Sequence, residues 1–318
     1  MTPAHARAAV VEASQRLLDA GLVAKTWGSV SVRLDEATMA ITPSGVAFPD
    51  LIADMVVAVD LETDQWSGGY RPSVERALHR QAYGRRPDVA AVVHTHQVAA
   101  SICAAARVGV PTPLGTVPCA KHGLPGSARL ARDTVAALGE GPAVLMANHG
   151  VLAVGASLDE AYDRVHLLER ACAEHVVARR PREGAHMPAD PDAPWDPSCL
   201  EPVPLRDGTS GWLSTAPFTL RFAELRRPMP PVLDDLAELA SRRVRVLRGM
   251  PKRRLRADAV LVAGRGALVI GPDHEATAMV IERAARAWIG AAGLGGAVEL
   301  PGWEARMLRA RRARSHVR

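Results

Sequence analysis

The segment RPDVAAVVHTH, Arg86–His96, places two histidines at the end of a β-branched run. We predict a strand over Val89–His96 and, after it, an alanine-rich helix over Gln97–Arg107. Residues i and i+2 of a strand point to the same face, so His94 and His96 can converge on one metal ion. Taken alone, such a pair is more often two packed or surface histidines than two metal ligands. Other residues of the chain are needed to distinguish these two interpretations.

The first 180 residues around this segment alternate helix and strand signals, which predicts an α/β domain. The last predicted helix starts with Ser157 and has Glu160 three residues later, the spacing of a capping box. The other predicted elements are helices Pro3–Ala20 and Val74–Tyr83, the hairpin strands Val30–Leu34 and Met39–Thr42, strands Ala143–Ala147 and Val151–Val154, and helix Ser157–Ala178.

A third histidine, His149, lies in the predicted turn between two strands, where Gly150 allows the backbone to approach closely. Three neutral imidazoles with open positions are typical of a catalytic rather than a structural metal site. Glu75, at the start of a predicted helix, is either a first-turn carboxylate favoured by the helix dipole or a proton acceptor and donor facing the metal. His79, four residues later, is interpreted as structural.

Composition limits the class of protein. The 318 residues are 48% hydrophobic and 23% charged, a globular balance with room for two domains. We find no apolar run of membrane-spanning length and no secretory signal. The cysteines show no CxxC spacing, so we expect neither a disulfide framework nor a thiolate zinc site. We therefore expect a cytoplasmic protein with no membrane partner, and the cysteines are Cys103, Cys119, Cys172 and Cys199.

Three regions are predicted along the chain: a catalytic domain over 1–180, a proline-rich linker over 181–225 and a basic region over 226–318. The basic region has 19 Lys and Arg against nine Asp and Glu. A basic half can indicate a nucleic-acid partner. Since only 4% of the chain is aromatic, few side chains could stack on bases, and we expect no nucleic-acid partner.

An internal repeat links the first and last regions. AVLMANHGVLAVG, Ala143–Gly155, aligns with AVLVAGRGALVIG, Ala259–Gly271. The second copy keeps the apolar strands and the turn but replaces His149 with Arg265. Nothing later in the chain matches the VVHTH sequence. The basic region is therefore interpreted as a degenerate half-repeat that has lost its chemistry.

Six motifs in this order resemble the class II aldolase/adducin family, which fuculose-phosphate aldolase typifies. The resemblance runs from about residue 5 to 180. It implies a three-layer α/β/α fold with a central, largely antiparallel sheet, followed here by a smaller α/β partial repeat. The motifs are GLVAKTWGSVSVR (Gly21–Arg33), ITPSG (Ile41–Gly45), RPSVERALH (Arg71–His79), RPDVAAVVHTH (Arg86–His96), VPCA (Val117–Ala120) and ANHGVLAVG (Ala147–Gly155).

The resemblance implies a role for each candidate residue. His94, His96 and His149 match the family's zinc ligands, and Glu75 matches its acid/base carboxylate. The implied activity is that of a metal-dependent lyase. It would cleave or form a C–C bond next to a carbonyl of a small, sugar-like hydroxy-carbonyl substrate, through a metal-stabilised enediolate. Zn²⁺ is the expected cofactor, with Fe²⁺ or Mn²⁺ as alternatives. A homo-oligomer is also implied.

Other activities stay open on the same scaffold: a decarboxylase, an epimerase, an iron-dependent oxidative cleavage, or a non-catalytic scaffold like adducin. The first copy of the repeat keeps the three histidines and Glu75, whereas the second copy has lost them. We take this uneven loss as favouring an enzyme.

Two departures from the family concern phosphate binding and the proton donor. The family's phosphate-binding positions correspond to Ser29, Ser44, Gly45 and Ser73, but Ser29 replaces an asparagine and Val74 replaces a serine. This predicts weakened phosphate binding. His122 stands where the family has a tyrosine that donates a proton, and it is either a donor or a bystander.

Overall fold

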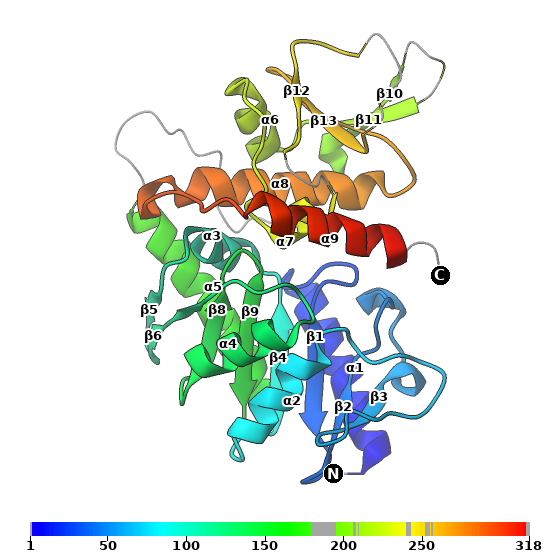
Figure 1. The fold of residues 1–318 in the computed structure, drawn as a ribbon, viewed down its shortest axis with the longest axis vertical. Coiled ribbons are helices and arrows are strands. Elements are labelled where there is room, and N and C mark those ends of the chain that lie inside the picture. The colour runs from blue at the N-terminus through cyan, green and yellow to red at the C-terminus, as the bar shows by residue number, and fades with distance from the viewer. Residues whose placement is uncertain are drawn as a thin grey trace. The chain divides into compact units, whose positions relative to one another are not determined.

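The computed structural model describes residues 2–179, 195–205, 208, 210–239, 243–251, 255 and 257–315. It divides into two compact units, Met1–His175 and Val176–Arg318. Each unit has its own β-sheet (Figure 1). No helix in the described part of the chain is both long and apolar enough to cross a membrane. All four cysteines have free thiols.

The first unit is built on a seven-stranded sheet of order β3-β2-β1-β4-β9-β8-β7. Neighbouring strands are antiparallel except β7 and β8, so the expected largely antiparallel sheet is confirmed. A separate hairpin joins β5 (Val110–Thr112) and β6 (Gly115–Val117). The strands of the sheet are β1 (Ser29–Arg33), β2 (Thr38–Ile41), β3 (Val57–Asp60), β4 (Ala91–Thr95), β7 (Cys119–Ala120), β8 (Ala143–Met146) and β9 (Gly150–Gly155).

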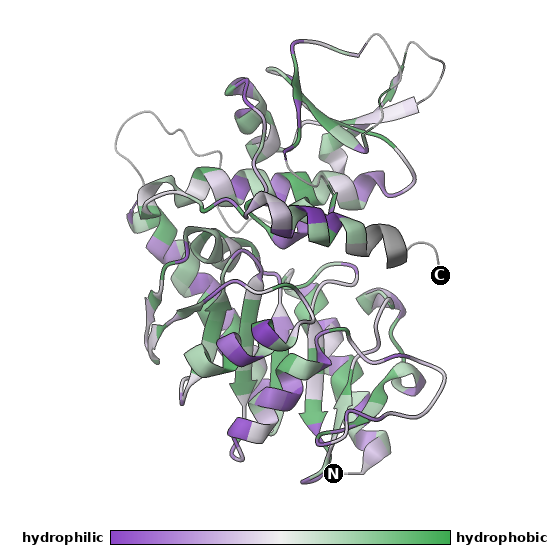
Figure 2. Ribbon diagram, viewed as in Figure 1, coloured by the Kyte–Doolittle hydropathy of each residue, from purple (hydrophilic) through white to green (hydrophobic). Residues whose placement is uncertain are grey.

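Helices cover both faces of this sheet, giving the expected three layers. One face carries α2 (Arg76–Arg85) and α4 (Ala128–Leu138), whose apolar side chains share a core with alternate residues of the strands. Helices α1 (Pro3–Asp19) and α3 (Val98–Ala106) pack on the strands from the other side, with α5 (Leu158–Ala178) joined to α3. The central strands are hydrophobic along their length because they are buried on both faces (Figure 2).

Two helix starts were predicted from the sequence. The Ser157 hydroxyl accepts from Glu160 N at 3.1 Å, as in the predicted capping box, but the Glu160 carboxylate accepts from the N of Ala156, one residue before Ser157, at 2.6 Å. Helix α2 begins at Arg76, later than predicted, and Glu75 occupies its non-helical N-cap position. The Ser73 hydroxyl accepts from Glu75 N at 3.2 Å and so holds this turn of the chain.

The second unit contains a five-stranded sheet of order β10-β11-β14-β13-β12. Its strands are β10 (Leu200–Pro204), β11 (Ser210–Ser214), β12 (Val246–Leu247), β13 (Ala259–Val262) and β14 (Gly266–Val269). Its helices are α6 (Pro217–Glu224), α7 (Asp234–Leu239), α8 (His274–Gly290) and α9 (Gly302–Ser315). Short 3₁₀ turns complete both units: Phe48–Asp50, Ala53–Met55, Pro197–Cys199 and Ala291–Leu294.

The linker expected over 181–225 differs from the structure. Residues 180–194 lie outside the described part of the chain, whereas β10, β11 and α6 occupy much of 200–224. Proline and acidic residues are dense in this region, but Leu213, Phe218 and Phe222 are buried in the second unit. Their burial explains why the segment folds despite its composition.

The second sheet repeats five strands of the first in order, direction and register. The sequence β10-β11-β14-β13-β12 corresponds to β1-β4-β9-β8-β7, and in both only the last pair is parallel. The register of the two hairpins agrees: Met146 lies opposite Gly150, as Val262 lies opposite Gly266.

This correspondence extends beyond the repeat visible in the sequence. Thr95 of β4 lies opposite Val151, and Ser214 of β11 lies opposite Ala267, the repeat counterpart of Val151. Leu213 and Thr215 therefore stand at the positions of His94 and His96. With Arg265 in place of His149, every histidine of the first unit's cluster has been replaced by a different residue in the second.

The start of α3, directly after the histidine strand, depends on a buried carboxylate of α5. Glu169 accepts from Ala99 N at 2.6 Å and from Ala100 N at 2.9 Å. We expect Glu169→Ala to lower the unfolding free energy of the first unit by about 2–3 kcal/mol, since two buried N–H groups lose their acceptor. Urea unfolding, with hydrogen exchange of α3, measures the effect. Glu174→Ala, an exposed carboxylate of the same helix, is the control, and equal stability of the two variants would contradict the prediction.

Candidate metal centre

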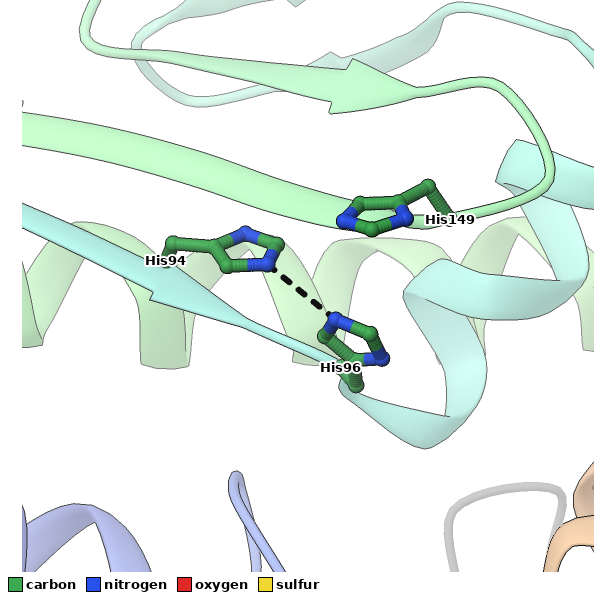
Figure 3. Close-up of side chains that lie close together, drawn as sticks. All are labelled: His94, His96 and His149. Atoms are coloured by element: carbon green, nitrogen blue, oxygen red, sulfur yellow. Dashed lines mark hydrogen bonds between the residues drawn. The ribbon is translucent and has the colours of Figure 1, made fainter. Parts of the chain in front are cut away.

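Three histidine rings converge at the end of β4 (Figure 3). His94 is the fourth residue of β4, His96 directly follows that strand, and His149 lies in the turn between β8 and β9. One ligand nitrogen from each ring lies within 4.8 Å of the others. The rings of His94 and His149 are stacked, with centroids 5.0 Å apart, and His96 approaches both edge-on. The structure thus brings together the three histidines predicted from the sequence.

Backbone geometry allows this convergence. Strand β9 pairs with β4, so the turn before β9 lies beside the end of β4. A Cβ on Gly150 would stand 2.3 Å from the carbonyl oxygen of Thr95 and 3.2–3.3 Å from the rings of His94 and His96. Only glycine permits this approach. Asn148, two residues before Gly150, adopts a positive φ of 59° in the turn.

Hydrogen bonding orients the ring of His94 for metal binding. Its Nδ1 lies 2.7 Å from the carbonyl oxygen of Val151, an acceptor, so Nδ1 carries the proton and Nε2 presents its lone pair. Nε2 of His94 lies 3.1 Å from Nε2 of His96. Two nitrogens on a tetrahedral zinc ion are about 3.3–3.4 Å apart. The spacing and the all-imidazole donor set therefore fit a divalent metal ion.

Glu75 completes the cluster. Its carboxylate oxygens lie 2.7 Å from Nε2 of His94 and 3.2 Å from Nε2 of His149, and its side chain is only 8% exposed. Burial by itself would raise the pKa of the Glu75 carboxyl, but in the metal-free site the protonated rings of His94 and His149 attract its charge and hold this pKa well below its usual value. A buried, ionised carboxylate beside three imidazoles can act as a further ligand or as a base.

A chain of polar side chains lies beneath the site. His79, completely buried on α2, contacts the hydroxyls of Ser29 at 2.8 Å and Ser31 at 2.7 Å, and Ser31 contacts the Tyr83 hydroxyl at 2.8 Å. Burial lowers the pKa of His79 to about 3, so its ring is neutral near pH 7. Sequence periodicity placed His79 on the same helical face as Glu75, but only the structure shows its contacts.

The four predicted substrate-binding residues separate into two pairs. Ser29 and Ser73 are buried, Ser29 pairs with His94 across the sheet, and both hydroxyls contact protein atoms. Ser44 and Gly45 are exposed on a loop, where Ser44 N donates to the carbonyl oxygen of Arg71. A small depression, lined by Thr26, Gly28, Thr42, Pro43, Val46, Phe48 and Leu51, lies beside this loop.

His122 lies outside the histidine cluster. Within the described residues, the group of three converging ligand nitrogens comprises His94, His96 and His149. His122 is buried two residues after β7, which runs parallel to β8. It therefore lies at the same end of the sheet as the turn that carries His149.

Comparison with known proteins agrees with this architecture. Residues 8–176 match the family described as Class II Aldolase and Adducin N-terminal domain. A 5-methylthioribulose-1-phosphate/5-deoxyribulose-1-phosphate aldolase of Rhodospirillum rubrum is 30% identical over 194 residues, which cover 58% of this chain and 86% of that protein. An L-ribulose-5-phosphate 4-epimerase of Salmonella paratyphi C is 34% identical over 178 residues, covering 49% and 76% of the two chains. Both relatives are enzymes.

Solved structures show the same likeness. An L-fuculose 1-phosphate aldolase superposes with a TM-score of 0.54 at 27% identity, covering 58% of this chain and 91% of that one. The L-fuculose-1-phosphate aldolase of Thermus thermophilus has a TM-score of 0.50 at 28% identity, covering 54% and 93%. Since the family match extends over more than half of the sequence, the chain belongs to the class II aldolase and adducin N-terminal domain family.

Proposed function

We propose that this enzyme is a metal-dependent lyase that cleaves or forms a C–C bond next to the carbonyl of a small, sugar-like hydroxy-carbonyl substrate. The observation that carries the proposal is the convergence of three imidazoles, two of which lie beside the buried carboxylate of Glu75. His94, His96 and His149 would hold the ion, with Zn²⁺ expected and Fe²⁺ or Mn²⁺ as alternatives. The similarity to an aldolase of Rhodospirillum rubrum supports a lyase.

Glu75 supplies the proton transfer in this proposal. A divalent ion, when bound, provides Lewis-acid polarisation of the substrate carbonyl. The Glu75 carboxylate can take the proton of the substrate hydroxyl as the neighbouring C–C bond breaks, and the bonding electron pair passes to the carbon next to the carbonyl. The protonated Glu75 can then give its proton to that carbon, and in the reverse direction its carboxylate removes a C–H proton there. The positive charge of a bound ion would favour the ionised form of Glu75 before this step, and its burial keeps bulk water from competing for the proton.

The remaining residue roles and the domain organisation are also proposals. Ser29, Ser44, Gly45 and Ser73 would contact the substrate, and His122 would donate a proton. Residues 1–180 would form the catalytic domain and 226–318 a half-repeat without a metal. A homo-oligomer is proposed from the family resemblance, and light scattering coupled to size-exclusion chromatography measures its size.

An epimerase is the second candidate, because the matching L-ribulose-5-phosphate 4-epimerase of Salmonella paratyphi C is 34% identical. The two activities differ in their products. A lyase releases two smaller carbonyl compounds, whereas an epimerase returns one compound of unchanged mass. Mass spectrometry of the products from a panel of ketoses and hydroxy-aldehydes separates these outcomes.

The histidine cluster predicts the metal content of the protein. Chain purified without chelator is expected to contain about one divalent ion, and His94→Ala/His96→Ala is expected to lose it, because one imidazole cannot retain the ion. Elemental analysis measures both. His166→Ala, an exposed histidine on α5, should retain the metal. Folded wild-type protein that does not bind added zinc would refute the proposed site.

The position of Glu75 predicts a loss of proton transfer. Glu75→Gln is expected to slow deuterium exchange from D₂O into the hydroxymethyl group of dihydroxyacetone by about 10²–10⁴-fold, the usual contribution of a positioned base. NMR measures the exchange, with metal content checked in the same sample. Glu62→Gln, an exposed carboxylate, is the control. Unchanged exchange in metal-loaded Glu75→Gln would assign the base elsewhere.

The residues around the loop of Ser44 predict weak selection for phosphate. The Ser29 and Ser73 hydroxyls already contact protein atoms, and Val74 is an exposed apolar side chain directly before Glu75. Phosphoglycolate and glycolate are therefore expected to bind the metal-loaded protein with affinities within about tenfold, since few polar contacts remain for the phosphate. Calorimetry measures both. A hundredfold preference for phosphoglycolate would contradict this expectation.

A further inference from the structure

The turn that carries His149 is attached to the end of α3 at two points. The backbone N of Asn148 donates to the carbonyl oxygen of Ala104 at 3.1 Å. The side-chain Oδ1 of Asn148 accepts from Nε of Arg107 at 2.9 Å. Arg107 directly follows α3 in the left-handed conformation, with φ 58°. Asn148 is completely buried, whereas Arg107 is exposed.

The second unit repeats the backbone part of this attachment. Gly264, the counterpart of Asn148, donates from its N to the carbonyl oxygen of Ala223 in α6 at 3.2 Å. Three residues after Ala223, as Arg107 is three residues after Ala104, Arg226 has φ 52°. The arginine and its left-handed backbone are thus present in both units. Only the side-chain contact differs, because Gly264 has no side chain to accept from an arginine.

This difference isolates the role of the Asn148 side chain. Both turn residues have a positive φ, 59° at Asn148 and 67° at Gly264, a conformation that glycine adopts without the strain that a side chain brings. The turn therefore forms without a side chain at this position. The unit that keeps the histidines has asparagine there, one residue before His149. The Asn148 side chain is therefore associated with the histidine cluster, which the first unit has and the second unit has lost.

We propose that Arg107 and Asn148 are positioning residues that hold the His149 turn in place for metal binding. The inference rests on the metal site of the proposed function. The bond from Arg107 fixes the Asn148 side chain, and with it the peptide that leads into His149. Without that bond the turn keeps its backbone attachment to Ala104 but gains freedom to rotate. The His149 nitrogen then spends less time within reach of an ion held by His94 and His96.

Zinc affinity, measured by competition with a chromogenic chelator, tests the proposal in Asn148→Gly, Arg107→Ala and the double variant. Loss of an outer contact to a metal ligand usually weakens binding by about 10–100-fold, and we expect this range in each single variant. The double variant should bind no more weakly than the weaker single variant, because both remove one interaction. Asn148→Asp, which keeps an acceptor for Arg107, should bind zinc within a few-fold of wild type.

The thermal midpoint of the metal-free protein separates positioning from structural support. Asn148→Gly should leave it unchanged or raise it, since glycine relieves the positive φ. Arg226→Ala, the matched change in the second unit, should leave zinc affinity unchanged. Wild-type zinc affinity in Asn148→Gly, or a loss that only follows lower metal-free stability, would overturn the proposal. A wild-type chain that binds no zinc would instead overturn the proposed function, and this inference with it.

Discussion

The site depends on the close approach of two backbones, where the turn before β9 meets the end of β4. Gly150 packs against the carbonyl of Thr95 at a distance that no Cβ could tolerate. The approach brings His149 beside two histidines that lie more than fifty residues earlier in the chain. Pairing of β4 with β9 maintains it along five residue pairs. A substitution at Gly150 would separate the strands and the ligands together.

Electrostatics then determines what the converged side chains can do. Glu75 is buried, and its ionised form is favoured because its oxygens lie beside Nε2 of His94 and of His149, whose protonated rings attract its charge. His79 is equally buried but lies between two serine hydroxyls, and it stays neutral. Two titratable groups four residues apart thus have opposite characters, one charged at the metal site and one neutral beneath it.

The second unit is an internal control for the first. It keeps strand order, hairpin register and the backbone bond from the turn to the preceding helix. A buried glutamate of its helix α8, Glu282, accepts from Phe218 N and Thr219 N, as Glu169 does at the start of α3. Features common to both units are those that the fold needs. Among the residues that the structure describes, the histidine cluster and the Arg107–Asn148 bond belong to the first unit, and we associate them with the proposed chemistry.

The sequence by itself determined most of the helices and strands that carry the site, the three candidate ligands and the family, but not β3, β7 or α4. Strand alternation, capping residues and the histidine motifs are local patterns, and local patterns survive in sequence. It also indicated the second hairpin. Only the tertiary structure decided that β11 corresponds to β4 and that Asn148 contacts Arg107. Strand pairing and side-chain contacts join residues that are distant in the chain, so they leave no periodic pattern in the sequence. Leu213 and Thr215, which stand at the positions of His94 and His96, also share no side-chain type with them that could reveal the correspondence.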